Sequence, residues 1–176
     1  MVIRIFIFVL LSLSVFAYFI PVEENTRKNS NEDIALLTFK DSTMYTLTTD
    51  SMNRIIDSKE AFRYKNRDIM YGSVLTLKGK DKDNKEIMDI LLSDMIIKEG
   101  DDFKFLNNVK YKRDNSITLT TNELLYNDKT GIARNTLPFE GTYFNNYIKG
   151  ENIYLNLNKY HMKANKAHFE VLIEKK

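Results

Sequence analysis

The sequence predicts an all-β domain that follows a single apolar segment at the amino terminus. Two observations predict this fold class: Ile5–Ile20 (IFIFVLLSLSVFAYFI) carries no charge, and from Ile34 onward apolar and polar residues alternate in short runs separated by turn residues. Such alternation has the two-residue period of strands with one apolar, buried face, which we call the dry face, and one face exposed to solvent. No helical period is sustained in this part of the chain. Turn signals every 8–12 residues or so favour an antiparallel sandwich, barrel or roll.

The apolar segment, residues 1–22, is expected to be a transmembrane anchor. Val2–Val22 meets the length of about 20 residues that a membrane-spanning helix needs, provided that Arg4 snorkels toward the headgroups. Arg4 precedes the segment and Glu23–Glu24 follow it, so the positive-inside rule places the amino terminus in the cytoplasm and the rest outside. A cleaved secretory signal is the alternative, because Val15–Ala17 offers small residues to a signal peptidase. The anchor is preferred because the apolar run continues past that site.

Length and composition indicate how the remaining chain is organised and which partners it is expected to lack. Residues 23–33 (EENTRKNSNED) are polar and aperiodic and read as a tether, and residues 34–176 have the length of one domain. The chain has no cysteine, which excludes disulfides and an acylated cysteine anchor. It has 26 Lys and Arg against 24 Asp and Glu, interspersed along every segment, so we expect no nucleic-acid partner.

The expected strands follow one another through the domain. Turn chemistry places a charged hairpin connection at 80–86, turns at 100–102 and 114–115, and a loop at 127–131 with Gly131 in a left-handed conformation. The runs between these turns predict strands at 34–39, 44–49, 52–56, 61–64, 69–78, 87–97, 103–106, 109–112, 117–126, 137–143, 147–148, 153–157 and 161–173. In the run after residue 109, Val109, Tyr111 and Arg113 share one face.

A short pattern recurs in several of these strands and predicts bends. Residues 119–126 (LTTNELLY) align with 162–169, 47–52 and 90–97 as apolar, any, small or apolar, two polar, then apolar. The step from the third to the sixth position breaks the two-residue period, and a bulge or bend would return the sixth residue to the dry face. Repeated bends would curve the sheet into a trough. Chance similarity among amphipathic strands is the alternative explanation.

Residue types that carry catalysis or bind metals form no recognisable motif. His161 and His168 are interpreted as surface histidines on opposite faces of one strand. The segment 81–86 (DKDNKE) lacks the central glycine of a calcium loop, and Leu92 stands where the bidentate glutamate belongs. The six glycines are scattered, so there is no phosphate-binding loop. We expect no enzyme, cofactor or metal site, and an exported hydrolase with an unrecognised site remains an alternative.

Four segments carry a resemblance to a known family. Gly100–Arg113 (GDDFKFLNNVKYKR) is similar to a strand pair around a G-x-V step, with Asn108 in the usual glycine place. Ile117–Tyr126 (ITLTTNELLY) resembles an L-x-T-x-x-L-x-Y strand, and Thr136–Phe139 (TLPF) a short x-P-V/F step. Ile148–Ile153 (IKGENI) resembles a G-x-G-L/I turn whose second glycine is replaced. With the apolar segment and tether, these features resemble the LptC family of lipopolysaccharide export.

The resemblance extends over roughly Ala35 to Glu174 and implies both a fold and a role. Members form an open antiparallel β-roll or jelly roll (OstA-like) with a slot-like apolar interior, behind one N-terminal transmembrane helix in the inner membrane. They receive lipopolysaccharide from an ABC transporter made of LptB, LptF and LptG and pass it to the periplasmic protein LptA. An acyl chain of about 14 carbons gains on the order of 10 kcal/mol from burial, so a conduit needs a continuous apolar lining.

The dry faces of the predicted strands supply candidates for that lining: Leu119, Leu124, Tyr126, Phe139, Ile153, Leu155, Met162, Ala164 and Phe169. Each is equally interpretable as an ordinary core residue. The last strand can add a partner strand through a free edge, with Ala167, Phe169, Val171 and Ile173 as candidate contacts. An anchored adaptor that binds only proteins is the alternative function.

Overall fold

The computed structural model describes residues 34–47, 52–80, 84–159 and 161–171, all within a compact unit that begins at Ile34. The predicted anchor (1–22), the tether (23–33) and the candidate Ile173 lie outside the described residues. None of the described residues belongs to a helix long and apolar enough to cross a membrane.

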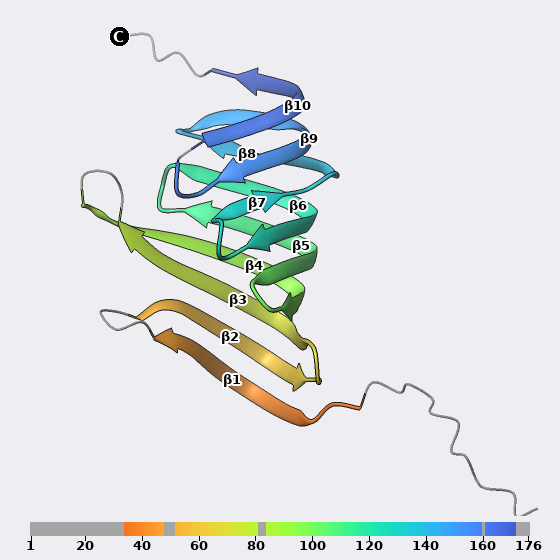
Figure 1. Ribbon diagram of the computed structural model, residues 1–176. Helices are drawn as coiled ribbons and strands as arrows, with labels where there is room; N and C mark the ends of the chain where they lie inside the picture. The colour runs from red at the N-terminus through yellow and green to blue at the C-terminus, as the bar shows by residue number, and fades with distance from the viewer. Residues whose placement is uncertain (1–33, 48–51, 81–83, 160, 172–176) are drawn as a thin grey trace, which may run out of the picture. The chain divides into compact units, whose positions relative to one another are not determined.

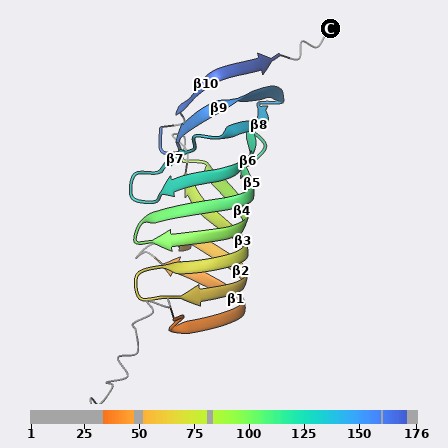
Figure 2. The same ribbon diagram turned by 90° about the vertical axis from the view of Figure 1, so that its right-hand side faces the viewer.

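The described residues form one antiparallel sheet of ten strands, which confirms the predicted all-β class. The strands stack in chain order from β1 to β10, with β8 set beside β7 (Figure 1 and Figure 2). Their bounds are β1 (Leu37–Leu47), β2 (Met52–Arg63), β3 (Asp68–Lys80), β4 (Glu86–Glu99), β5 (Asp102–Arg113), β6 (Ile117–Asn127), β7 (Ile132–Arg134), β8 (Pro138–Tyr143), β9 (Asn146–Asn156) and β10 (His161–Glu170).

Strands β7 and β8 share one place in the sheet, between β6 and β9. β7 pairs with the end of β6, whereas β8 pairs with its beginning, and both also pair with β9. Buried Asn135 lies at the break between them: its amide donates to Thr121 Oγ1 over 2.7 Å, and its Oδ1 accepts from the Ile153 backbone N–H over 3.1 Å. One side chain thus replaces ladder hydrogen bonds that the broken strand cannot make.

Four strands are longer than predicted, because the prediction divided each into two. The expected pairs 34–39 and 44–49, 52–56 and 61–64, 103–106 and 109–112, and 147–148 and 153–157 fall on the continuous strands β1, β2, β5 and β9. The alternation of buried residues is interrupted by bends inside β2, β5 and β9, and on β1 Asp41 has a φ of 46°. The sequence pattern cannot distinguish such bends from turns. The short strand β7 was not predicted, whereas the hairpin connection at 80–86 and the left-handed Gly131 (φ 65°) are confirmed.

The bends form a continuous line across the sheet. On β2, β3 and β4 the buried side chains step three places instead of two, and the paired serines Ser58, Ser73 and Ser93 lie on one side of that step. On β5 the line continues as a bulge at Asn107–Asn108, with φ values of 61° and 50°. Small serines suit the crowded inner side of a bend, and asparagine tolerates the left-handed backbone.

The predicted bend pattern is correct on β6 and displaced on β4. On β6 the buried residues are Leu119, Leu124 and Tyr126, so the period breaks between the third and sixth positions as expected. On β4 the step runs from Ser93 to Ile96, one residue later than the alignment placed it. The alignment predicted the presence of a bend better than its position, because several residues around the bend on β4 are apolar and fit either register.

Candidate functional site

A cavity of about 1230 Å³ lies among the last strands, and we call it the β9–β10 cavity. That volume exceeds the 300–1,000 Å³ typical of small-molecule pockets. The walls come from the chain before and at the start of β4, the end of β5 with its turn into β6, the β8–β9 turn, and β9 and β10. The lining residues include Ile87, Tyr111, Arg113, Ile117, Tyr143, Phe144, Ile148, Leu155, Leu157, Met162 and Phe169.

Three of the nine predicted lining residues meet at this cavity. Leu155 lies buried on its wall, Met162 is half-buried, and Phe169 is 47 % exposed. They come from the paired strands β9 and β10, where Leu155 faces Met162 directly. The structure therefore gathers these three side chains around one partly open space.

The other six predicted lining residues lie elsewhere. Leu119, Leu124 and Ile153 are buried in the hydrophobic core, and Ala164 packs against it. Tyr126 lines a separate hollow of about 510 Å³, and Phe139 lines another of about 550 Å³. The dry faces are thus divided among core packing and three separate spaces.

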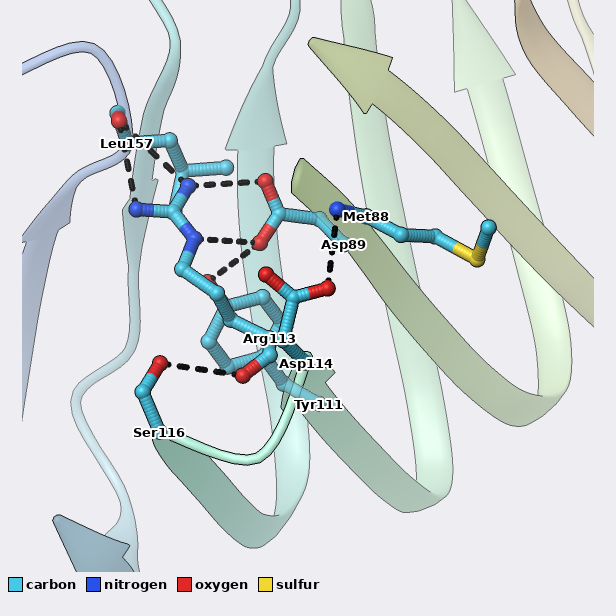
Figure 3. A network of polar contacts seen from close by, with 7 residues as sticks. All are labelled: Met88, Asp89, Tyr111, Arg113, Asp114, Ser116 and Leu157. Carbon is cyan, nitrogen blue, oxygen red and sulfur yellow. Dashed lines mark hydrogen bonds and ion pairs between the residues drawn. The ribbon is translucent and has the colours of Figure 1, made fainter. Parts of the chain in front are cut away.

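A buried polar network joins the wall of the β9–β10 cavity to the core (Figure 3). Arg113 makes a bidentate ion pair with Asp89: Nε donates to Oδ1 and Nη2 to Oδ2, both over 2.7 Å. The Tyr111 hydroxyl donates to the same Oδ1 over 2.7 Å. Arg113 Nη1 and Nη2 also donate to the Leu157 carbonyl oxygen over 3.3 Å, which ties β5 to the chain beyond β9.

Because this network is buried, its charges are costly unless they are paired. Arg113 and Asp89 are only 4 % and 6 % exposed, so each charge needs the other to compensate for its lost hydration. Burial, reinforced by the negative charge of Asp89, raises the pKa of Tyr111 far above its ordinary value. Tyr111 is therefore neutral at physiological pH, and its hydroxyl donates a hydrogen bond to the Asp89 carboxylate.

A second arginine makes a similar link between distant strands. Arg54 of β2 pairs with Asp128, which follows β6, and its guanidinium lies 5.4 Å from the Phe103 ring centroid. The Tyr126 hydroxyl donates to Asp128 Oδ1 over 3.3 Å. Burial lowers the pKa of Arg54, although an arginine remains charged under ordinary conditions. Arg54 thus connects β2 to the chain beyond β6, and Arg113 connects β5 to the chain beyond β9 through the Leu157 carbonyl.

The charged residues around the cavity have mixed signs. Lys85, Glu86, Asp114 and His161 all line it, so its rim favours neither anions nor cations strongly. His161 and His168 are exposed, as predicted, and His168 Nε2 lies 2.8 Å from Glu170 Oε1. Within the described ranges, no group of three or more histidines and carboxylates is placed to hold a metal ion.

Among the described residues, both ends of the sheet present an unpaired strand edge. In that part of the chain, β1 pairs with β2 alone and β10 with β9 alone. Among the candidate edge residues, Ala167, Phe169 and Val171 are exposed on or just after β10. At the opposite end, Leu37 and Phe39 on β1 are 49 % and 47 % exposed. Phe169 therefore belongs both to the cavity and to the free edge.

The sequence prediction missed several residues of this site. Arg113 carried a usable signal, because the alternation placed it on the same face as Val109 and Tyr111, where a charge needs a partner. Its partner Asp89 lies 24 residues earlier on the neighbouring strand, and nothing local indicates that pairing. Tyr143 ends the strand predicted at 137–143, and Phe144 lies in the turn that follows; neither was identified as a lining residue.

No known protein-family model matches this sequence, and no curated protein matches it.

Proposed function

We propose that this protein is a membrane-anchored conduit subunit for lipopolysaccharide, similar in role to the LptC family. In this proposal residues 1–22 hold it in the inner membrane as a single-pass protein, with the amino terminus in the cytoplasm and the sheet in the periplasm. It receives lipopolysaccharide from an ABC transporter of LptB, LptF and LptG type and passes it to an LptA-like periplasmic protein. The role is not enzymatic and needs no cofactor.

The β9–β10 cavity is the observation that carries this proposal. It is large, largely apolar and partly open, and it lies next to the free edge of β10. Each buried methylene of an acyl chain is worth about 0.8 kcal/mol, so such a space can hold a chain that water rejects. A neighbouring protein paired to β10 would lie beside Phe169, and a chain leaving the cavity there would meet the partner without crossing water.

A protein-binding adaptor is the second candidate, and the two sheet ends favour it. Both β1 and β10 leave a strand edge unpaired and apolar side chains exposed, which is the arrangement that accepts an added strand. The densely packed core of β2–β5 provides a rigid support for such docking and needs no lipid. This adaptor would use the edges and leave the cavity empty.

Site-specific photocrosslinking separates the two functions. A photoreactive benzoylphenylalanine replaces Met162, which lines the cavity, and in a matched control replaces Lys163, the next residue on β10, which is exposed. In cells with an active exporter, we expect lipopolysaccharide adducts at Met162 and few at Lys163. Adducts to protein alone at both positions would favour the adaptor and contradict the conduit.

A pull-down from detergent-solubilised inner membrane tests the partners. We expect the full-length protein to retain an ABC transporter with bound lipopolysaccharide. The mass of the mature protein in that sample also tests the anchor, because signal cleavage would remove the apolar segment.

A further inference from the structure

The β8–β9 turn contains an aromatic residue in an unfavourable conformation. Tyr143 pairs with Asn146, so the two-residue turn is Phe144–Asn145, and both residues have positive φ, 45° and 67°. Such turns strongly prefer Asn-Gly or Asp-Gly. Nine described residues other than glycine have positive φ, and seven of them are Asn or Asp. Phe144 and Lys166 are the exceptions.

The fold does not require the Phe144 ring. Its side chain is 60 % exposed and makes an edge-to-face contact with Tyr143 at a centroid distance of 4.8 Å. The backbone N–H of Phe144 donates to the Ser116 carbonyl over 2.8 Å, a bond that any residue but proline provides. The Asn146 amide donates to the Phe144 carbonyl over 3.1 Å, so the turn is held by groups outside the ring. Phe144 is unfavourable in this turn and buries little of its own side chain, so function explains its presence better than stability does.

The position of the ring indicates that function. Phe144 lines the β9–β10 cavity and is also largely exposed, so it stands where the cavity opens to the solvent. Phe169 lines the cavity and is half-exposed as well, whereas Leu155 lies buried in its wall. An apolar chain approaching from outside would therefore meet exposed aromatic rings before it reached the interior.

We propose that Phe144 is the portal residue of the β9–β10 cavity and captures the end of a fatty acyl chain before the chain slides inward. This inference rests on the proposed function. A flexible, unbranched chain suits a partly open space of this volume, and the mixed charges of Lys85, Glu86 and Asp114 give a headgroup little to bind. Recognition then depends on the apolar chain, and the ring provides its first contact.

The test uses the full-length protein in amphipol and the fluorescent fatty acid 11-(dansylamino)undecanoic acid. Phe144→Asn removes the ring and places a residue that tolerates the positive φ. We expect its association rate, measured by stopped flow, to fall at least about fivefold, the loss expected for an aromatic anchor. We expect its melting temperature to equal or exceed that of the wild type, which a merely structural ring would not allow.

Two control variants separate the portal from the cavity. Tyr45→Asn removes an exposed aromatic ring from β1, outside the cavity lining, and should leave the association rate unchanged. Met162→Asp places a carboxylate in the apolar lining from a half-buried position, where a bound acyl chain would remove it from water, so it should strongly reduce binding.

The outcomes are distinguishable. If Phe144→Asn binds at the wild-type rate while Met162→Asp binds much less probe than the wild type, the portal is wrong and the conduit stands. Faster binding by Phe144→Asn would also overturn the portal, because the ring would then cover the opening. If the wild type binds no more probe than Met162→Asp, the conduit and the portal both fail.

Discussion

The two halves of the sheet differ in how completely they fill their interior. Of the ten largest fully buried side chains among the described residues, nine come from β2–β5, and Ile153 on β9 is the tenth. Strands β2–β5 are 12 to 14 residues long and unbroken, whereas β7 and β8 are short and share one place in the sheet. The β9–β10 cavity is lined by residues of this second, less filled half, together with the start of β4 and the end of β5.

The two halves therefore contribute differently: the packing of β2–β5 stabilises the sheet, and the hollow near β10 can bind a ligand. Dense packing gives most of the free energy of folding, because each buried side chain gains both hydrophobic and dispersion energy. A cavity forfeits those contacts and leaves room for a ligand. A sheet that concentrates its packing in β2–β5 can therefore tolerate a hollow near β10 without losing its fold.

The largest expected effect compares one side chain from each half. Phe105→Ala on β5 removes a fully buried ring and should lower the free energy of unfolding by about 3–5 kcal/mol. Met162→Ala on β10 should cost less than about 1.5 kcal/mol, because Met162 already borders a cavity and is only half-buried. Urea denaturation of the full-length protein measures both values. Equal losses would show that the two halves are packed alike.

The next effect concerns the ion pair between Asp89 on β4 and Arg113 on β5, which lies within the densely packed half, while Arg113 also reaches the Leu157 carbonyl beyond β9. Asp89→Asn leaves the buried Arg113 charge without its carboxylate and should cost about 3 kcal/mol in unfolding free energy. The double variant Asp89→Leu, Arg113→Met buries no charge, so it should recover much of that loss.

Comparing these two variants isolates the cost of the unpaired charge. Recovery in the double variant would show that the pair matters through mutual neutralisation. If the double variant is as unstable as Asp89→Asn, the hydrogen bonds of the network, from Arg113 to the Leu157 carbonyl and from Tyr111 to Asp89, matter more than charge neutralisation.

Sequence reasoning recovered the parts of the fold that depend on local alternation. Val109 and Tyr111 are buried on the same face as Arg113, and Leu155 is buried beside the half-exposed Tyr154, as the two-residue period requires. The bends were harder to predict, because a left-handed asparagine within a strand resembles the turn between two strands. Asn107–Asn108 was therefore interpreted as a break between strands.

The site was recovered less completely, for a different physical reason. Leu155 is buried, Met162 is half-buried and Phe169 is 47 % exposed, so the three predicted lining residues differ in burial. The alternation within a strand does not distinguish a face that meets the core from one that meets a cavity. Which one it meets depends on residues far apart in sequence, such as the β8–β9 turn and the β5–β6 turn, which meet through the Phe144 N–H and the Ser116 carbonyl. The sequence pattern of a single strand does not predict that contact between the two turns.

The smallest expected effect tests the bends themselves. Asn152 on β9 has a φ of 53° and stands where the family resemblance places a glycine, just as Asn108 does on β5. Asn152→Gly should change the free energy of unfolding by less than about 0.5 kcal/mol, because glycine adopts this conformation freely. Asn152→Val should cost about 1–2 kcal/mol, because a β-branched residue is strained there.

A matched control on the same strand shows whether the left-handed backbone is responsible. Lys149 is exposed on β9 and has no positive φ, so Lys149→Val should be neutral or slightly stabilising, since valine favours strands. Chemical denaturation of the full-length variants gives the comparison. If valine costs no more at position 152 than at 149, the bend does not depend on a left-handed residue. Asn152 would then no longer support the likeness to a glycine-bearing family, whereas a clear difference would show that asparagine replaces glycine at this bend for a conformational reason.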